Sequence, residues 1–187
     1  GAVLAGQVAK EGLRTVPPRE NAGNIDIKQI TPGASVLIPV HVEGALFSTG
    51  DVHFAQGDCE ATGTAIEMRS RVHVSFAVHK GKAARRNIRS LQIFRDTSFN
   101  EPVLATPRRF YATTGLSTTH DDEIRPEDLS VAARNALLAM IDYLGDRGYS
   151  PQQAYTICSV AVDLHVSQVV DVPNFIVTAV LPLDIFL

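Results

Sequence analysis

The chain has 187 residues, 45% of them hydrophobic, and a formal net charge of −3 at pH 7. That length and apolar content suffice for one domain or two small lobes, and the weak negative charge gives no broad attraction to nucleic acid or anionic lipid. No apolar run is long enough to cross a bilayer, and the two cysteines make no disulfide framework. Composition therefore predicts a soluble cytoplasmic protein without nucleic-acid or membrane partners.

The first two thirds of the chain have the pattern of a β-rich body. Residues 1–24 are loop-like, with two consecutive prolines that favour extended backbone. Alternating apolar and polar residues then predict strands, two of them long and two short: 35–42, 71–79, 92–95 and 109–113.

The polar residues of this body are mostly typical of a surface. His41, His73 and His79 fall within strand patterns that have no acidic cluster beside them, so we expect surface histidines rather than metal ligands. The basic run 80–89 has no interleaved aromatic residues, which favours a solvated loop over a nucleic-acid platform.

The pattern changes after Pro126. Asp128 or Ser130 can cap a helix that ends near the glycines at 145 and 148. A second helix begins at Ser150, where Pro151 suits the first helical position and Gln153 completes a capping box. The inner faces predicted for the two helices are Val131, Leu137, Leu138, Ile141 and Leu144, then Ala154, Ile157, Cys158 and Ala161.

Strands are predicted again over 164–170 and 175–181. The expected fold is α+β overall. A mainly β body, sandwich- or barrel-like, would cover residues 1–126 and carry the active site, and an α-α-β-β lobe would cover 127–187.

Acidic residues and a histidine concentrate in the stretch 50–67. If this stretch is extended, Asp51 and His53 share one face, and Gln56, Asp58 and Glu60 share another after the turn. Carboxylates with a neutral imidazole suit a divalent ion such as zinc, with calcium as the alternative. Two ordinary Gly-Asp turns with an exposed histidine would explain the same residues without any site.

The same stretch resembles the acetamidase/formamidase family, whose members carry a GDxHxxQGDGE signature followed by a Gly-Thr-(Ala/Gly)-Ile-Glu strand. Other blocks also match: the loop at 19–28 is similar to R-E-N-G-G-N-x-D-I-K, and YATTGLS at 111–117 and SQVVDVP at 167–173 are similar to later blocks. The resemblance runs from about Pro17 to the end, and several blocks in the right order are more specific than one motif. The positions that match the signature and its strand are Gly50, Asp51, His53, Gln56, Gly57, Asp58, Glu60, Gly63, Thr64, Ala65, Ile66 and Glu67.

The resemblance implies hydrolysis of a short carboxamide, of formamide or acetamide type, to ammonia and a carboxylate. In this hypothesis a metal ion activates the attacking water, and one carboxylate shuttles the proton. Asp58 and Glu60 could exchange the roles of metal ligand and proton shuttle. The matching loop at 19–28 adds Asn24 and Asp26, which with Gln56 would bind the substrate amide or the ligands, while Glu67 is left outside the site. The hypothesis assigns Asp51, His53 and Asp58 to the metal and Glu60 to the proton transfer.

Two other functions fit the same residues. A small cyclic amide, a γ-lactam, could be the substrate, because the same chemistry opens any small amide. A catalytically silent assembly or binding protein on this scaffold is the alternative outside enzymes.

The chain departs from the family pattern in two ways. Cys59 replaces the Gly of QGDGE, and neighbouring carboxylates would raise its pKa, so we expect a packed thiol rather than a nucleophile. Family members are longer, with β-rich structure upstream, and this chain begins with Gly1. We therefore expect a C-terminal portion whose N-terminal segment or subunit is missing, working as a homo-oligomer.

Overall fold

The computed structural model describes residue 12 and residues 15–95, 109–119, 124–170 and 172–186. The chain forms two compact units. The first combines Gly1–Ser48 with His73–Asp96, and the second combines Thr49–Val72 with Thr97–Leu187. The division at residue 126 predicted from the sequence is a different partition and stays a prediction.

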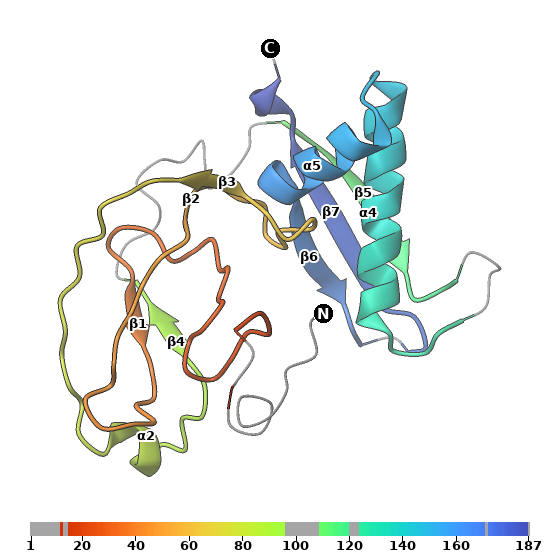
Figure 1. The fold of residues 1–187 in the computed structure, drawn as a ribbon. Coiled ribbons are helices and arrows are strands. Elements are labelled where there is room, and N and C mark those ends of the chain that lie inside the picture. The colour runs from red at the N-terminus through yellow and green to blue at the C-terminus, as the bar shows by residue number, and fades with distance from the viewer. Residues whose placement is uncertain (1–11, 13–14, 96–108, 120–123, 171, 187) are drawn as a thin grey trace. The chain divides into compact units, whose positions relative to one another are not determined.

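The first unit holds little regular structure (Figure 1). Strand β1 (Ser35–Leu37) pairs antiparallel with β4 (Gln92–Phe94), and a single helical turn, α2 (Lys82–Arg85), lies between them in the chain. The strand predicted over 92–95 is therefore confirmed, whereas that over 35–42 is reduced to its first three residues.

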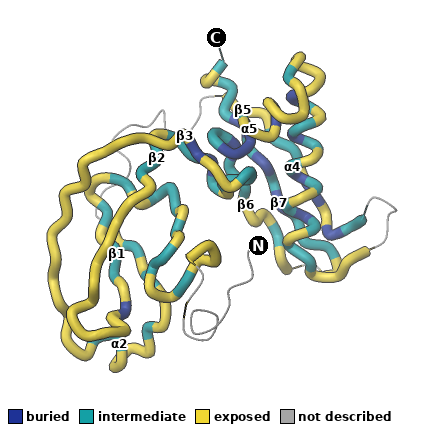
Figure 2. The backbone as a smooth tube through the Cα atoms, in the orientation of Figure 1, coloured by how far each residue is buried: buried dark blue, intermediate teal, exposed yellow. Residues whose placement is uncertain are grey.

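The long strand predicted over 71–79 is wrong for the structure described here. No described strand contains these residues, although they keep the alternating pattern that predicted one. All of them are exposed (Figure 2). Because strand pairing needs a neighbour to accept its backbone hydrogen bonds, an alternating pattern alone does not make a strand.

The second unit is organised around a three-stranded antiparallel sheet in the order β5-β7-β6. Strand β7 (Ile176–Pro182) lies in the middle, between β5 (Phe110–Leu116) and β6 (Asp163–Gln168). Side chains of β7 alternate in burial, and Val177, Ala179 and Leu181 enter the core. The predicted strands are confirmed here because each finds a partner along its length. A short 3-10 turn, η1 (Leu183–Ile185), follows β7.

Helix α4 (Leu129–Asp146) packs on this sheet and against α5 (Pro151–Ala161) (Figure 1). Its buried face overlaps the predicted stripe only in part. Leu144 is fully buried, and Leu137 and Ile141 pack partly buried against the core, but Leu138 is 48% exposed. The residues that face the core are Ala132, Ala136, Met140 and Leu144.

The small residues of this face allow the helix and sheet to approach closely. A Cβ built on Gly115 of β5 would lie 2.1 Å from the carbonyl oxygen of Ala132, so only glycine fits there. Thr113 Oγ1 donates a hydrogen bond of 2.8 Å to the Ala136 carbonyl across the same contact. A hydrophobicity pattern favours large residues, whereas this interface selects small ones.

The helix caps agree with the sequence. Asp128, rather than Ser130, caps α4, because its Oδ1 accepts from the backbone N–H groups of Ser130 (2.9 Å) and Val131 (3.1 Å). Ser150 and Gln153 form the predicted capping box of α5, with Pro151 at its start.

The fold is thus mixed α+β, as predicted. The described strands form three small sheets of two, two and three strands, and these do not make up the sandwich- or barrel-like body expected from the sequence. Among the described residues, no helix has the length and apolar character needed to cross a membrane.

Candidate active site

Strands β2 (Val52–Ala55) and β3 (Ile66–Met68) of the second unit pair antiparallel and enclose the acidic stretch. Their register places His53 directly opposite Glu67, and the register shifts between His53 and Ala55. Directly opposed residues of antiparallel strands lie close enough for their side chains to interact. The hairpin therefore brings together an imidazole and a carboxylate that are fourteen positions apart in sequence.

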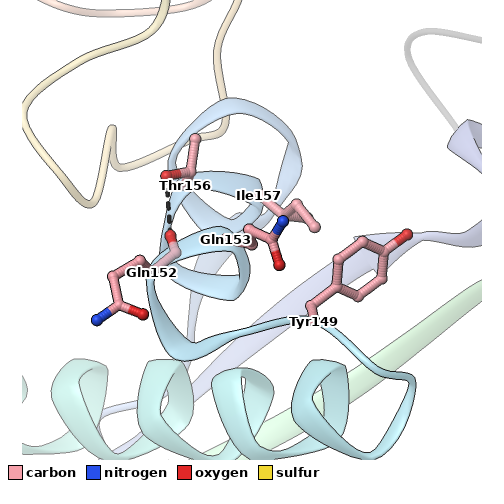
Figure 3. Close-up of a pocket in the computed structure, with 5 residues that line it drawn as sticks. All are labelled: Tyr149, Gln152, Gln153, Thr156 and Ile157. Carbon is pink, nitrogen blue, oxygen red and sulfur yellow. Dashed lines mark hydrogen bonds between the residues drawn. The ribbon is translucent and has the colours of Figure 1, made fainter.

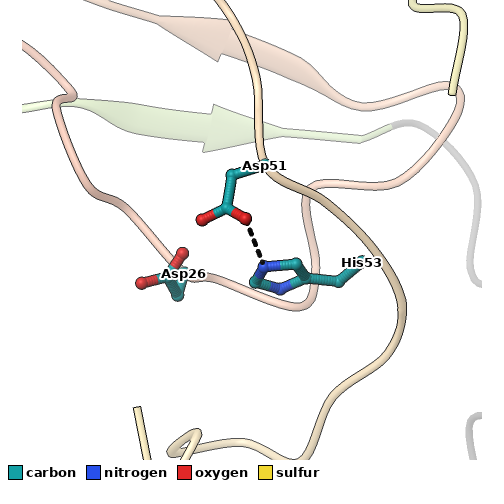
Figure 4. Close-up of side chains that lie close together, drawn as sticks. All are labelled: Asp26, Asp51 and His53. Carbon is teal, nitrogen blue, oxygen red and sulfur yellow. Dashed lines mark ion pairs between the residues drawn. The ribbon is translucent and has the colours of Figure 1, made fainter. Parts of the chain in front are cut away.

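His53 is the central group of the site. Its side chain is only 11% exposed, and its two ring nitrogens have different surroundings. Nδ1 lies 2.8 Å from Gln56 Oε1, an acceptor, so that Nδ1 carries a proton. Nε2 lies 3.4 Å from Asp51 Oδ1 (Figure 4) and 3.2 Å from Glu67 Oε2.

The Nε2 atom is buried and has no hydrogen bond of acceptable geometry among the described residues. In the neutral tautomer set by Gln56, Nε2 presents a lone pair to two carboxylate oxygens, which repel it. Either a second proton or a cation resolves this conflict. The donor set of one imidazole nitrogen and carboxylate oxygens is one that divalent metal ions accept.

The electrostatics of His53 agree with this environment. Burial lowers its pKa, but the Gln56 hydrogen bond and the negative charges of Glu67 and Asp51 outweigh burial, so the pKa is raised above its ordinary value. Positive charge on or beside the ring is therefore stabilised here.

Glu67 holds its two oxygens in different roles. Oε1 accepts from the Ala65 backbone N–H (3.3 Å) and from Thr64 Oγ1 (3.4 Å), while Oε2 faces His53. Because one oxygen is tied to the hairpin, the other is held near the ring.

Glu60 joins them from the turn between the strands. One ligand atom each from His53, Glu60 and Glu67 lie within 4.8 Å of one another, a separation that a single metal ion could bridge. Glu60 has a left-handed backbone (φ 44°), as does Asp51 (φ 57°). Non-glycine residues in this region cost free energy, and such strain is commonest at functional sites.

The turn that carries Glu60 is anchored to α5 and β6. Gly57 N donates to the Ser159 carbonyl (2.9 Å), and a Cβ on Gly57 would lie 2.2 Å from the Val162 carbonyl oxygen. Asp58 N donates to Asp163 Oδ1 (2.9 Å). The second unit therefore fixes the turn that carries Glu60 through hydrogen bonds of its backbone.

The buried hydroxyl of Ser159 is the centre of this anchorage. Its Oγ accepts from Thr62 N (3.1 Å) and Thr62 Oγ1 (2.9 Å) and donates to the Thr64 carbonyl (2.6 Å). Tyr155 adds a hydrogen bond from its hydroxyl to the Ala61 carbonyl. One helix thus holds consecutive parts of the loop between Glu60 and β3.

The structure groups the predicted site residues differently from the two faces that strand alternation predicted. Asp51 and His53 lie together, as expected, and Glu60 lies near His53. Gln56 contacts His53 rather than sharing a second face with Asp58, because residues 57–60 turn instead of running extended. Asp58 is absent from the ligand clusters found among the described residues, and its backbone serves as an anchor.

Asn24 and Asp26 belong to the first unit. Asn24 has a left-handed backbone (φ 53°), and its side-chain amide donates to the Val16 carbonyl. That contact ties down the loop, as an Asx residue often does. Their part in substrate binding stays a prediction.

Sequence reasoning missed Glu67 and Ser159. Glu67 could have been included by pairing the strands on either side of the loop, but the shifted register and the loop shape that set its partner are tertiary properties. Ser159 gave no signal, because a serine within an amphipathic helix is ordinary.

Cys59 fits the prediction of a non-nucleophilic thiol, but the expectation that it is packed is wrong, because the residue is exposed. Desolvation of the thiol, more than the charges of Asp163, Asp58 and Glu60, raises its pKa to about 11, although the residue as a whole is exposed. At neutral pH the reactive thiolate is therefore scarce.

The second unit also has an open depression at the beginning of α5, and none of the candidate site residues lines it. Figure 3 shows that it follows one side of the helix and the turn before it. Its lining residues are Tyr149, Gln152, Gln153, Thr156 and Ile157. No carboxylate or imidazole lines it, so it offers no hydrolytic chemistry.

Comparison with known proteins gives matches over nearly the whole chain. Residues 2–187 match the Acetamidase/Formamidase family model. The chain is 38% identical over 189 residues to a formamidase from Methylophilus methylotrophus, spanning 98% of this chain and 45% of that protein. It is 40% identical over 152 residues to an acetamidase from Mycolicibacterium smegmatis, spanning 80% of this chain and 36% of that protein.

A solved structure shares the fold. The gamma lactamase from Delftia acidovorans has a TM-score of 0.84 and 39% identity, with 98% of this chain and 45% of that chain covered. The chain thus spans less than half the length of these relatives. With a family match over nearly its whole length, the chain belongs to the acetamidase/formamidase family.

Proposed function

We propose that this chain carries the metal-dependent site of an amidase that hydrolyses a short carboxamide, of formamide or acetamide type, to ammonia and a carboxylate. The observation that supports it most is the buried Nε2 of His53, which has no hydrogen bond to any residue that the structure describes and faces two carboxylate oxygens. The relatives named formamidase and acetamidase supply the reaction class.

The geometry around His53 brings in Glu67 as a ligand. His53 and Glu67 would hold the ion from opposite strands of the hairpin. Asp51, 65% exposed and with its Oδ1 3.4 Å from His53 Nε2, is kept from the original hypothesis as a third donor, while Glu60, whose ligand atom lies within 4.8 Å of those of His53 and Glu67, keeps the proton-transfer role. Gln56 would fix the tautomer of His53 rather than bind substrate, as outer partners of ligating histidines do. Asp58, a ligand in the original hypothesis, is replaced by Glu67.

Zinc is the ion that best suits one imidazole and carboxylates, and calcium is the alternative. When bound, such an ion would polarise the amide carbonyl and make water more acidic. Glu60, carried on the strained turn, would accept a proton from the attacking water and return it to the departing amine. Asn24 and Asp26 remain the predicted contacts to the amide.

A cyclic substrate is the second candidate, favoured by the structural similarity to a gamma lactamase. The two reactions differ in their products. A short carboxamide releases ammonia, whereas an opened lactam keeps its amine on the same molecule. Product analysis with formamide, acetamide and 2-pyrrolidone therefore separates them.

Metal content tests the site directly. We expect about one divalent ion per chain after dialysis, measured by elemental analysis, and loss of that ion in His53→Ala and Glu67→Gln. Gln56→Ala should weaken binding by about 10- to 100-fold, because it removes the partner that orients the ring.

Asp58→Asn and Glu60→Gln test which residues bind the metal and which one transfers the proton. If Glu67 has replaced Asp58, Asp58→Asn retains the ion. Glu60→Gln should also retain it but reduce ammonia release by about 10²- to 10⁴-fold, the usual contribution of a general base. A metal-free wild-type chain, or full turnover in Glu60→Gln, would contradict these assignments.

The complete enzyme is proposed to include further polypeptide, because the matched relatives are more than twice as long as the part this chain covers. This proposal includes what the sequence led us to expect: an N-terminal segment or subunit, homo-oligomeric assembly, a β-rich sandwich- or barrel-like body and a cytoplasmic location.

A further inference from the structure

The first unit exposes an alternating apolar segment. Val74, Phe76 and Val78 are 51%, 70% and 79% exposed, on one side of an alternation whose other members are His73, Ser75, Ala77 and His79. Single exposed apolar residues are common on protein surfaces, but a row at strand spacing is not.

The backbone of this segment is also unpaired. Among the described residues, the N–H and C=O groups of residues 73–78 have no hydrogen-bond partner, and no strand includes them. A half-buried antiparallel strand would use both features at once, with its backbone in a ladder and its apolar side chains against a core. The segment has the pattern of such a strand without the partner.

Neighbouring parts of the first unit extend the same surface. Phe47, half exposed, makes an edge-to-face contact with Phe76, with ring centroids 4.9 Å apart. Leu46, next to Phe47 in the chain, is 77% exposed. These residues add apolar area that this unit does not cover.

We propose that residues 73–79 form a strand-addition surface, which pairs with a β-strand from the part of the family's longer chains that this chain does not match. The added strand would form hydrogen bonds with the unpaired backbone groups of residues 73–78. Apolar side chains from the same part of the longer chain would cover Val74, Phe76 and Val78. Metal binding, as proposed above, does not depend on this surface, because the candidate ligands belong to the second unit.

The solved relative points to this occupant rather than to a second copy. In the gamma lactamase from Delftia acidovorans, the matched fold makes up 45% of one continuous chain. The remaining polypeptide is covalently tied to the same fold, so its effective concentration at this surface is high. A second copy of the chain has no such advantage.

The test joins this chain to the unmatched part of the Methylophilus methylotrophus formamidase, in the order found in that relative, and compares it with the 187-residue chain alone. Hydrogen exchange of the 73–79 amides is measured by mass spectrometry. We expect fast exchange in the chain alone and slowing by about 100-fold or more in the joined protein, since ladder hydrogen bonds protect amides.

Two matched substitutions in the segment identify the buried face. Val78→Lys should lower the Tm of the joined protein by about 5 °C or more and leave that of the chain alone unchanged. Ser75→Lys, on the polar side of the alternation, should leave both unchanged.

The proposal is overturned if the amides stay unprotected in the joined protein, or if Ser75→Lys is as harmful as Val78→Lys. Concentration-dependent self-association of the chain alone that protects 73–79 would assign the surface to a second copy and also overturn it. Metal analysis of the same samples separates the two proposals, because a metal-free but protected segment would contradict only the proposed function.

Discussion

The second unit encloses its apolar residues between a three-stranded sheet and two helices, whereas the first unit leaves many of its own exposed. Both contain segments with clear strand patterns. In the second unit β5 and β6 pair with β7 along their lengths, while residues 73–79 of the first unit, which have the same kind of pattern, pair with no strand in the described part of the chain. A strand pattern therefore becomes a strand only where the fold provides an edge to pair with and a core to face.

The largest expected effect tests the packing that distinguishes the second unit. Gly115→Val would force side-chain atoms into the backbone of α4, where a Cβ already approaches to 2.1 Å. We expect a loss of about 3 kcal/mol or more in the free energy of unfolding, from overpacking, measured by urea denaturation.

The matched control is Gly145→Ala in α4, where a Cβ meets nothing within 4 Å. This change should stabilise the chain by up to about 1 kcal/mol, because alanine favours helix. Equal effects of the two substitutions would mean that the contact between α4 and the sheet is not what holds the second unit together.

A smaller effect is expected at the anchorage of the site. Ser159→Ala leaves the Thr62 N–H and the Thr64 carbonyl without the hydroxyl they share. We expect a cost of about 1–3 kcal/mol in stability, as for unsatisfied buried groups. Metal affinity should fall as well, because the loop that leads into β3, the strand carrying Glu67, loosens.

Thr156→Ala serves as the control for Ser159→Ala. Its hydroxyl donates only to the Gln152 carbonyl within α5, and the residue is exposed (Figure 3). It should change neither stability nor metal content appreciably. If Ser159→Ala loses stability but keeps full metal affinity, the serine supports the fold without positioning the site.

The smallest effect concerns the cap of α4. Asp128→Ala removes the acceptor for two backbone N–H groups and should cost about 1 kcal/mol in thermal unfolding. Ser130→Ala should be close to neutral, because Ser130 lies inside the helix rather than at its cap. A larger loss of stability for Ser130→Ala than for Asp128→Ala would mean that Ser130, not Asp128, caps the helix.

Much of the second unit was predictable because its signals are local. The capping box at Ser150 and Gln153 is a contact over three positions, and the strands near 109–113 and 175–181 carry their own alternation. The predicted stripe of α4 was only partly right: Leu144 is buried and Leu137 and Ile141 pack against the core, but the face opposite Gly115 is formed by small residues that a hydrophobicity pattern does not select.

The candidate site was only partly predictable, because part of it depends on residues that are far apart in the sequence. The sequence by itself determined that Asp51, His53 and Glu60 gather within one short stretch, and that several motif blocks in order indicate the family. Only the tertiary structure decided that Glu67 lies opposite His53, that Gln56 sets its tautomer, and that Ser159 anchors the turn. Motifs and caps depend on neighbours along the chain, whereas register, close packing and burial depend on partners far away in it.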